Sequence, residues 1–293
     1  MKNFRSIKGL IDIIDQYDVF ILDQWGVMHD GNKGYAHAIR CVKKLYQHKN
    51  DIIIISNSSK RKMSAIKKLP KLGFDPEYFV EVMTSGEMIW QSLKNQKHDF
   101  TKKINKNCYH IYDQSKEDGK YYVDGLEKFN FVEKIEEADF ILGCTTSPGL
   151  NSIDYVPLLT KALSKKLPFV CANPDYESIE GNSDKTIICM GTIAELYKRL
   201  GGEIFVLGKP SLDIYIESTK IINQFDKSKI LAIGDSIYHD IKGANLFGVD
   251  SLLITSGIHH SSFDNNRPEW NSDMNQVKNL GITPTFLCSK FQL

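Results

Sequence analysis

The chain has 293 residues, with 37 Lys and Arg against 36 Asp and Glu, which gives a formal net charge of +1 at pH 7. Hydrophobic residues make up 42% and charged residues 25%, proportions that exclude a disordered or fibrous protein. The near-zero charge argues against a nucleic-acid-binding protein. No apolar run approaches the roughly 20 residues that a membrane-spanning helix needs, so we expect neither nucleic acid nor membrane as a partner.

Two features indicate a cytoplasmic protein. Asp12, Asp15 and Asp18 interrupt the segment where an export signal needs an unbroken apolar run. The six cysteines are scattered without a Cys-x-x-Cys pair. This scatter favours reduced thiols over a disulfide framework or a zinc site.

Short apolar runs alternate with longer amphipathic stretches along most of the chain. The runs lack polar alternation, which is typical of strands buried on both faces, and cover residues 19–22, 52–55, 79–83, 140–142, 169–171, 204–207, 230–233 and 252–254. Helical spacing separates them, as in Ala38, Cys41 and Leu45. The alternation predicts an α/β fold, with a doubly wound parallel sheet and helices on both faces. A polar tail over residues 256–283 precedes a last expected strand near residues 284–288.

Polar side chains directly follow four of these runs. In an open parallel sheet, ligands bind beyond the carboxyl ends of the strands. The residues in question are Asp23 after the first run, Ser56 and Asn57 after the second, Lys209 after residues 204–207, and Asp235 after residues 230–233, with Asp240 a little further on. We therefore expect them to face one common mouth.

This set of side chains has a specific chemistry. Two carboxylates ~4 Å apart repel each other by about 4 kcal/mol at an effective dielectric constant near 20, so Asp23 beside Asp235 requires a cation to stay ionised. Oxygen ligands without a nearby histidine or thiol point to Mg²⁺ rather than zinc. Ser56 and the adjacent backbone amides can hold phosphate oxygens, while Lys209 neutralises their charge. A carboxylate next to Mg²⁺ can also act as a nucleophile and form an aspartyl-phosphate.

The order of these residues resembles a known family. Asp23, Ser56, Lys209 and Gly234-Asp235 followed by Asp240 look like the four motifs of the haloacid dehalogenase (HAD) superfamily. The segment between Ser56 and Lys209 resembles the α/β cap of class II of that superfamily, which includes the NagD-like phosphatases. The resemblance implies a Rossmann-like core formed by residues 1–84 and 184–293, with an inserted α/β cap at residues 85–183.

The resemblance also implies roles for individual residues at a Mg²⁺ site. Asp23 is implied as nucleophile and metal ligand. The main-chain carbonyl of Trp25 and the carboxylate of Asp235 are implied as further ligands. Asp240 is implied at the metal site, where it orients metal-bound water or Lys209.

Substrate contacts follow from the same resemblance. Ser56 and the amide of Asn57 are implied to bind the phosphoryl group, and Lys209 to stabilise its charge in the transition state. Asn173 and Asp175 belong to an Asn-Pro-Asp stretch that is also similar to class II sequences. We expect them to contact the substrate when the cap closes.

One residue departs from the family pattern. HAD phosphatases usually carry a second aspartate, a general acid and base, two positions after the nucleophile, where this chain has Trp25. An indole N–H only donates, and general acid–base catalysis contributes about 10²–10⁴-fold, or roughly 3–5 kcal/mol. The stretch around Trp25 resembles a class II subgroup with tryptophan at this place. Two alternatives to the missing acid stay open. Either His29 or Asp30 supplies the proton, or the leaving group of the substrate needs no protonation.

Each motif taken alone also has an ordinary explanation. Asp23 and residues 56–59 could be helix caps, and Asp240 would be favoured in any first helical turn by the helix dipole. Gly208-Lys209-Pro210 is an ordinary turn signal. His259 and His260 are adjacent, so their side chains point apart, and we expect a solvated loop there.

Two functions compete at this point. The first is a Mg²⁺-dependent phosphatase acting slowly on a small phosphorylated metabolite, with the cap excluding macromolecules and bulk water. The alternative is a catalytically weak phosphometabolite-binding or regulatory protein that keeps the pocket. By analogy with class II relatives, a homodimer is a further expectation.

Overall fold

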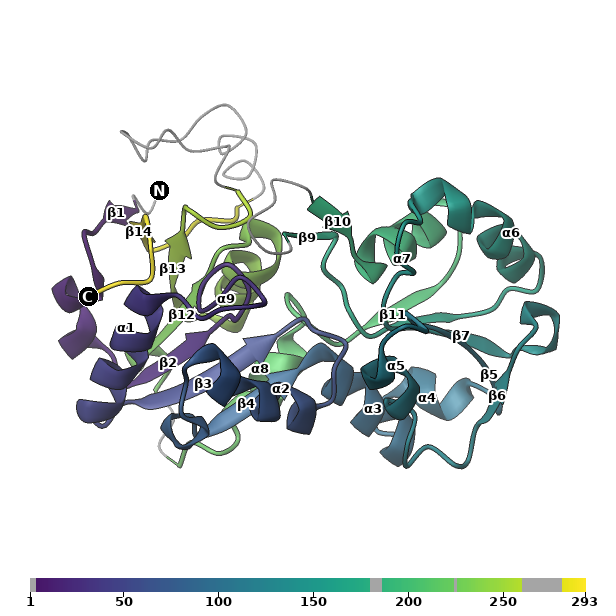
Figure 1. Cartoon of the computed structure of the whole chain (residues 1–293), viewed down its shortest axis with the longest axis horizontal. Coiled ribbons are helices and arrows are strands. Elements are labelled where there is room, and N and C mark those ends of the chain that lie inside the picture. Colours follow the sequence, from purple (N-terminus) through teal and green to yellow (C-terminus); the bar gives the residue numbers. More distant parts are fainter. Residues whose placement is uncertain (1–3, 180–185, 224–225, 260–280) are drawn as a thin grey trace.

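The computed structural model describes residues 4–179, 186–223, 226–259 and 281–293. It has a larger and a smaller lobe, on the left and right of Figure 1. Both chain ends lie on the larger lobe, where β1 pairs with β14. None of the described helices is long and apolar enough to cross a membrane.

A sheet of parallel strands forms the centre of the larger lobe. Its order is β1 (Arg5–Ser6), β14 (Phe286–Cys288), β13 (Asp250–Ile254), β12 (Ile230–Gly234), β2 (Val19–Leu22), β3 (Asp51–Ser56) and β4 (Glu81–Thr84). The chain proceeds from β2 through β3 to β4 in one direction and from β12 through β13 to β14 in the other. The strand order therefore reverses between β2 and β12, the position where doubly wound sheets bind ligands.

Both faces of this sheet are buried, as the unbroken apolar runs predict. Phe20 and Leu22 join the cluster under α1 (Ala36–Gln47) and α2 (Lys62–Lys68). Val19 and Ile21 point the other way, into the cluster that holds α8 (Leu212–Thr219) and α9 (Lys242–Phe247). This split is the two-residue period of a strand, and it confirms the predicted fold class.

The smaller lobe contains a second parallel sheet. Its order is β11 (Ile204–Val206), β8 (Phe169–Cys171), β7 (Phe140–Gly143), β5 (Asn107–Ile111) and β6 (Asn130–Val132). An antiparallel pair, β9 (Glu177–Ile179) and β10 (Thr186–Ile188), extends from it toward the larger lobe. The α-helices of this part are α3 (Ser85–Asn95), α4 (Asp99–Lys103), α5 (Glu117–Tyr121), α6 (Val156–Ser164) and α7 (Met190–Arg199).

Short single-turn helices complete the description. A π-helical turn, Ile237–Ile241, follows β12 and leads into α9. The 3₁₀ turns are Leu10–Asp12, Ile14–Gln16, Leu69–Leu72, Pro76–Tyr78, Ile135–Glu137, Ser152–Tyr155 and Lys227–Lys229.

The structure corrects the expected domain boundary at residues 183 and 184. β11 was expected to belong to the larger sheet, but Ile204–Val206 pair with β8 of the smaller one, and α7 packs in the same lobe. The return to the larger lobe therefore comes after β11. An apolar run indicates that a strand is buried, but it does not indicate to which of two sheets the strand belongs. Of the expected polar tail, residues 260–280 lie outside the described residues.

A core substitution tests this arrangement of layers. Ile54 on β3 is fully buried beneath α1, so Ile54→Ala should lower the free energy of unfolding by about 2–5 kcal/mol. Urea denaturation measures the change. Ile153 is 75% exposed, and Ile153→Ala is the matched control, with an expected change within about 0.5 kcal/mol. Similar losses in both variants would contradict the assignment of Ile54 to the core.

Candidate active site

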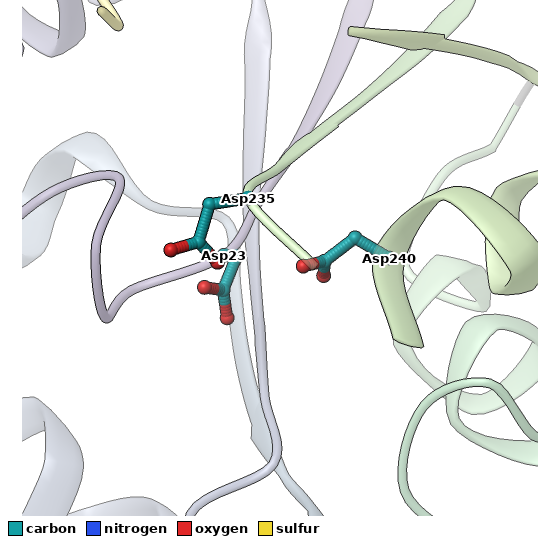
Figure 2. A group of neighbouring side chains, drawn as sticks. All are labelled: Asp23, Asp235 and Asp240. Atoms are coloured by element: carbon teal, nitrogen blue, oxygen red, sulfur yellow. The ribbon is translucent and has the colours of Figure 1, made fainter. Parts of the chain in front are cut away.

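Asp23 and Asp235 stand at the point where the strand order reverses. They follow the paired strands β2 and β12, in which Leu22 lies opposite Ile233. Both residues are buried, at 8% and 6% exposure. One carboxylate oxygen from each, together with one from Asp240, lie within 4.8 Å of one another. Figure 2 shows Asp23 and Asp235 close together at the strand ends and Asp240 pointing toward them from the adjoining helix.

The ammonium group of Lys209 joins two of these carboxylates. Its Nζ donates to Asp23 Oδ1 at 2.5 Å and to Asp240 Oδ1 at 2.7 Å. The other oxygen of Asp240, Oδ2, accepts the N–H of Ser236 at 3.0 Å. Both oxygens of Asp240 thus have hydrogen-bond donors, and one of these donors is the ammonium group of Lys209.

Lys209 follows a strand of the smaller sheet and not, as expected, a strand of the larger one. We expected it at the end of a strand in the larger sheet, but β11 belongs to the smaller sheet. Lys209 lies in the segment that runs from β11 to α8, and its side chain is only 3% exposed. The site therefore takes its ammonium group from the connection between the two lobes.

The charges at this site do not balance. Burial raises the pKa of Asp23 to about 7, and nearby Asp240 acts in the same direction, while Lys209 opposes it. Burial, followed by the charge of Asp23, raises the pKa of Asp235 well above its usual range. Burial alone would lower the pKa of Lys209, but the charges of Asp23 and Asp240 raise it. One ammonium group beside three buried carboxylates leaves excess negative charge, which a divalent cation would neutralise.

The loop after Asp23 is shaped around Asp235. Gly26 has a φ of +75°, and a Cβ at this position would lie 1.9 Å from Asp235 Oδ2, so only glycine fits without displacement. The same oxygen accepts the N–H of Ile258 at 2.9 Å. The clustered carboxylates of Asp23, Asp235 and Asp240 offer only oxygen atoms, which are the ligands that suit Mg²⁺.

The indole of Trp25 packs against its own loop. A Cβ on Gly31 would lie 2.2 Å from this ring, and the ring of His29 meets it edge to face, with centroids 5.3 Å apart. His29 Nδ1 accepts the N–H of Gly31 at 3.0 Å. Asp30 Oδ1 accepts the N–H groups of Asn32 and Lys33. The expected substitutes for the missing acid, His29 and Asp30, are therefore both engaged in turns of this loop.

Ser56 is the last residue of β3 and Asn57 follows it, and both are buried. Ser56 Oγ accepts the N–H of Ser58 at 3.3 Å. Asn57 Oδ1 accepts the N–H of Lys209 at 2.7 Å, and its Nδ2 donates to the carbonyl oxygen of Lys209 at 3.2 Å. The side chain of Asn57 thus holds the backbone that carries the ammonium group.

Asn173 and Asp175, the two residues of the smaller lobe that were expected to contact the substrate, have different hydrogen-bond partners. Asp175 Oδ1 accepts a hydrogen bond from Asn57 Nδ2 at 2.8 Å, so the structure brings Asp175 to the site. Asn173 Oδ1 instead accepts the N–H of Asp175 at 3.1 Å. Asn173 therefore shapes the turn that presents Asp175.

Two histidines lie near the site, and sequence reasoning missed one of them, His239. His239 lies in the π-helical turn, 7% exposed, with Nδ1 3.4 Å from Asp175 Oδ1. His259 lies in a turn and is partly exposed, and its Nε2 accepts the N–H of Ile237 at 3.3 Å; His260 lies outside the described residues. The usable signal for His239 was its place between Asp235 and Asp240, in a turn that must face the mouth.

Comparison with known proteins identifies the family of this chain. A family model described as haloacid dehalogenase-like hydrolase matches residues 20–140, and a second, described as HAD-hydrolase-like, matches residues 206–281. The two matched segments contain Asp23, Ser56, Lys209, Asp235 and Asp240. The chain belongs to the HAD superfamily.

Solved HAD structures have the same fold. A haloacid dehalogenase-like hydrolase from Brucella suis 1330 is 28% identical, with a TM-score of 0.81 over 97% of this chain and 99% of that one. NagD from E. coli K-12 is 17% identical, with a TM-score of 0.63 over 94% and 97%. A glycerol phosphate phosphatase from Mycobacterium tuberculosis in complex with magnesium is 19% identical, with a TM-score of 0.67 over 99% and 78%. No curated protein matches the sequence.

The loop of this HAD protein that carries Trp25 also makes a pH-dependent contribution to stability. Burial, followed by the charge of Lys68, lowers the pKa of His29 to about 4, whereas an unfolded histidine titrates near 6.5. As the pH falls below about 6.5 the unfolded chain takes up this proton first, so the contribution of neutral His29 is present above that pH and is lost toward pH 4.

We therefore expect His29→Gln to weaken this dependence. As the pH falls from 6.5 to 4, the wild type should lose stability relative to His29→Gln. The difference between their free energies of unfolding should change by up to about 1.4 kcal/mol per pH unit. Urea denaturation across this range measures it. His110, whose pKa burial also lowers to about 4, provides a second variant, His110→Gln, with the same expected slope. A difference that stays constant with pH would show that His29 titrates normally in the folded protein.

Proposed function

We propose that this HAD protein is a Mg²⁺-dependent phosphatase that hydrolyses a small phosphorylated metabolite through an aspartyl-phosphate intermediate. The supporting observation is the cluster at the end of the sheet, where carboxylate oxygens of Asp23 and Asp235 lie within 4.8 Å of each other and Lys209 Nζ donates to Asp23. An exposed helix cap would need neither the burial nor the unbalanced charge. The ordinary explanations of the separate motifs do not account for this convergence.

The donor atoms at this edge suit magnesium. Asp23 Oδ2, Asp235 Oδ1 and the carbonyl oxygen of Trp25 would hold the cation, and Asp240 would orient Lys209. When bound, Mg²⁺ neutralises charge on the phosphoryl oxygens and on Asp23. The magnesium complex of the M. tuberculosis phosphatase, which shares the fold, supports this choice of ion.

The chain's own groups divide the reaction between them. One carboxylate oxygen of Asp23 attacks phosphorus, the bond to the leaving oxygen breaks, and the phosphoryl group is held as an acyl phosphate. Lys209 stabilises the charge on the phosphoryl oxygens, while Ser56 and the backbone amide of Asn57 bind them. Water then cleaves the acyl phosphate, which releases phosphate and restores the carboxylate.

The position that usually carries the proton donor for the leaving group is occupied by Trp25 in this site. The Trp25 ring packs on Gly31 and His29 and offers no acid to the leaving group. We therefore propose slow turnover of substrates whose leaving group needs a proton. The same observation favours the second candidate, a catalytically weak phosphometabolite-binding or regulatory protein.

We further propose a cytoplasmic location, a small-molecule substrate and a homodimer. All six cysteines are free and buried, in keeping with a reducing, cytoplasmic location. Asp175 of the smaller lobe contacts the mouth directly, which favours a small substrate over a macromolecule. A homodimer is proposed by analogy with class II relatives only.

The assay for this function is phosphate release from sugar phosphates, nucleotides and pyridoxal phosphate. We expect at least one of them to be hydrolysed with Mg²⁺ and none after chelation. Asp23→Asn should lower kcat by about 10³-fold or more because it removes the nucleophile, with the melting temperature as the check on folding. Equal activity in the variant, or activity that survives chelation, would contradict the proposed mechanism.

A second variant tests the role of Trp25. Trp25→Asp supplies a carboxyl group at the position of the missing acid and should raise kcat on an alkyl phosphate by about tenfold or more, within the 10²–10⁴-fold range of general acid catalysis. Trp25→Phe removes the same indole contacts without adding an acid and is the matched control. If Trp25→Asp folds, binds Mg²⁺ and is no faster than the control, the explanation of slow turnover fails.

A further inference from the structure

A chain of hydrogen bonds leads from the smaller lobe to the backbone of Lys209. Asp175 Oδ1 accepts from Asn57 Nδ2 at 2.8 Å and lies 3.4 Å from His239 Nδ1. Asn57 in turn contacts both backbone polar groups of Lys209, at 2.7 Å and 3.2 Å. Asp175 is therefore two hydrogen bonds away from the residue whose ammonium group joins Asp23 and Asp240.

The turn that carries Asp175 is held firmly by its own lobe. The N–H of Asp175 donates to Asn173 Oδ1 at 3.1 Å, and its carbonyl oxygen accepts the N–H of Gly191 at 3.1 Å. A Cβ on Gly191 would lie 2.2 Å from the carbonyl oxygen of Pro174, so α7 begins in direct backbone contact with this turn. Asp175 therefore moves with the smaller lobe.

We propose that Asp175 is a positioning residue that couples docking of the smaller lobe to the placement of Lys209 through Asn57. The amide of Asn57 has one acceptor and two N–H donors, and Asp175 with the two backbone groups of Lys209 occupies them all. Asn57 is only 2% exposed, so loss of Asp175 leaves a buried donor without its partner and frees the amide to turn. The backbone of Lys209 then loses its fixed orientation.

This role replaces the expected contact between Asp175 and the substrate. A carboxylate beside a phosphoryl site repels the anion, whereas a carboxylate already bound to Asn57 and near His239 is suited to hold the two lobes together. The kinetic part of the proposal rests on the proposed phosphatase function. Its structural part does not, because it concerns only the hydrogen bond from the N–H of Lys209 to Asn57.

Two variants of Asp175 and one control separate this role from general docking of the lobes. Asp175→Ala removes the acceptor, and Asp175→Asn keeps an oxygen that Asn57 and His239 can reach. Asp118 also links the lobes, through an ion pair with Lys60 at 2.5 Å, and it has no hydrogen bond to Asn57. Asp118→Asn is therefore the matched control, and melting temperatures show whether each variant folds.

The first measurement is hydrogen exchange of the backbone amide of Lys209 in the full chain without substrate. Asp175→Ala should speed this exchange by about tenfold, because the hydrogen bond from the N–H of Lys209 to the amide oxygen of Asn57 weakens once Asn57 can turn. Asp175→Asn and Asp118→Asn should stay within about threefold of the wild type. Unchanged exchange in Asp175→Ala, or equal acceleration in Asp118→Asn, would overturn the coupling.

The second measurement is the division of the effect between kcat and KM. Asp175→Ala should lower kcat by about tenfold and change KM by less than about threefold, because Lys209 acts on the transition state. Asp175→Asn should restore kcat. A change in KM alone would make Asp175 a substrate contact and overturn its positioning role. A wild type without phosphatase activity would remove the proposed function, while the exchange measurement would still decide the coupling.

Discussion

The charge imbalance among the carboxylates of Asp23, Asp235 and Asp240 constrains everything around the site. Their oxygens lie within 4.8 Å of one another in a buried place, and Lys209 supplies one positive charge against three acidic groups. Burial shifts the pKa values of Asp23 and Asp235 upward, which is the cost of keeping them close without a cation. In the proposed function, a divalent ion would offset this cost and keep Asp23 ionised as the nucleophile.

The fold places these groups by means of ordinary backbone structure. β2 and β12 are neighbours at the reversal of strand order, so the residues that follow them meet without any special loop. Gly26 lets the chain pass Asp235 at a distance that no other residue allows. The smaller lobe contributes through its connection to α8, which carries Lys209, and through the turn at Asp175. Both lobes therefore contribute to the candidate site, and Asn57 contacts Lys209 and Asp175 at their junction.

Much of this was predictable from sequence because apolar runs and motif order are local signals. Asp23 and Asp235 directly follow strands, so their convergence follows from a parallel sheet. The structure brings Lys209 to Asp23 and Asp240 although β11 belongs to the smaller sheet, because the order of the motifs does not depend on the sheet assignment. The strand β5 mixes Asn107, Tyr109 and His110 with apolar residues, and its pattern gave no clear run. Contacts such as Asp175 with Asn57 join residues 118 positions apart, and no local pattern encodes them.

The most direct test of the account is a crystal structure of the wild-type protein grown with Mg²⁺. The account predicts an octahedral ion bound by Asp23 and Asp235 at about 2.0–2.1 Å, with Lys209 still in contact with Asp240. An ion bound elsewhere, or Asp23 and Asp235 without a shared ion at saturating magnesium, would contradict it.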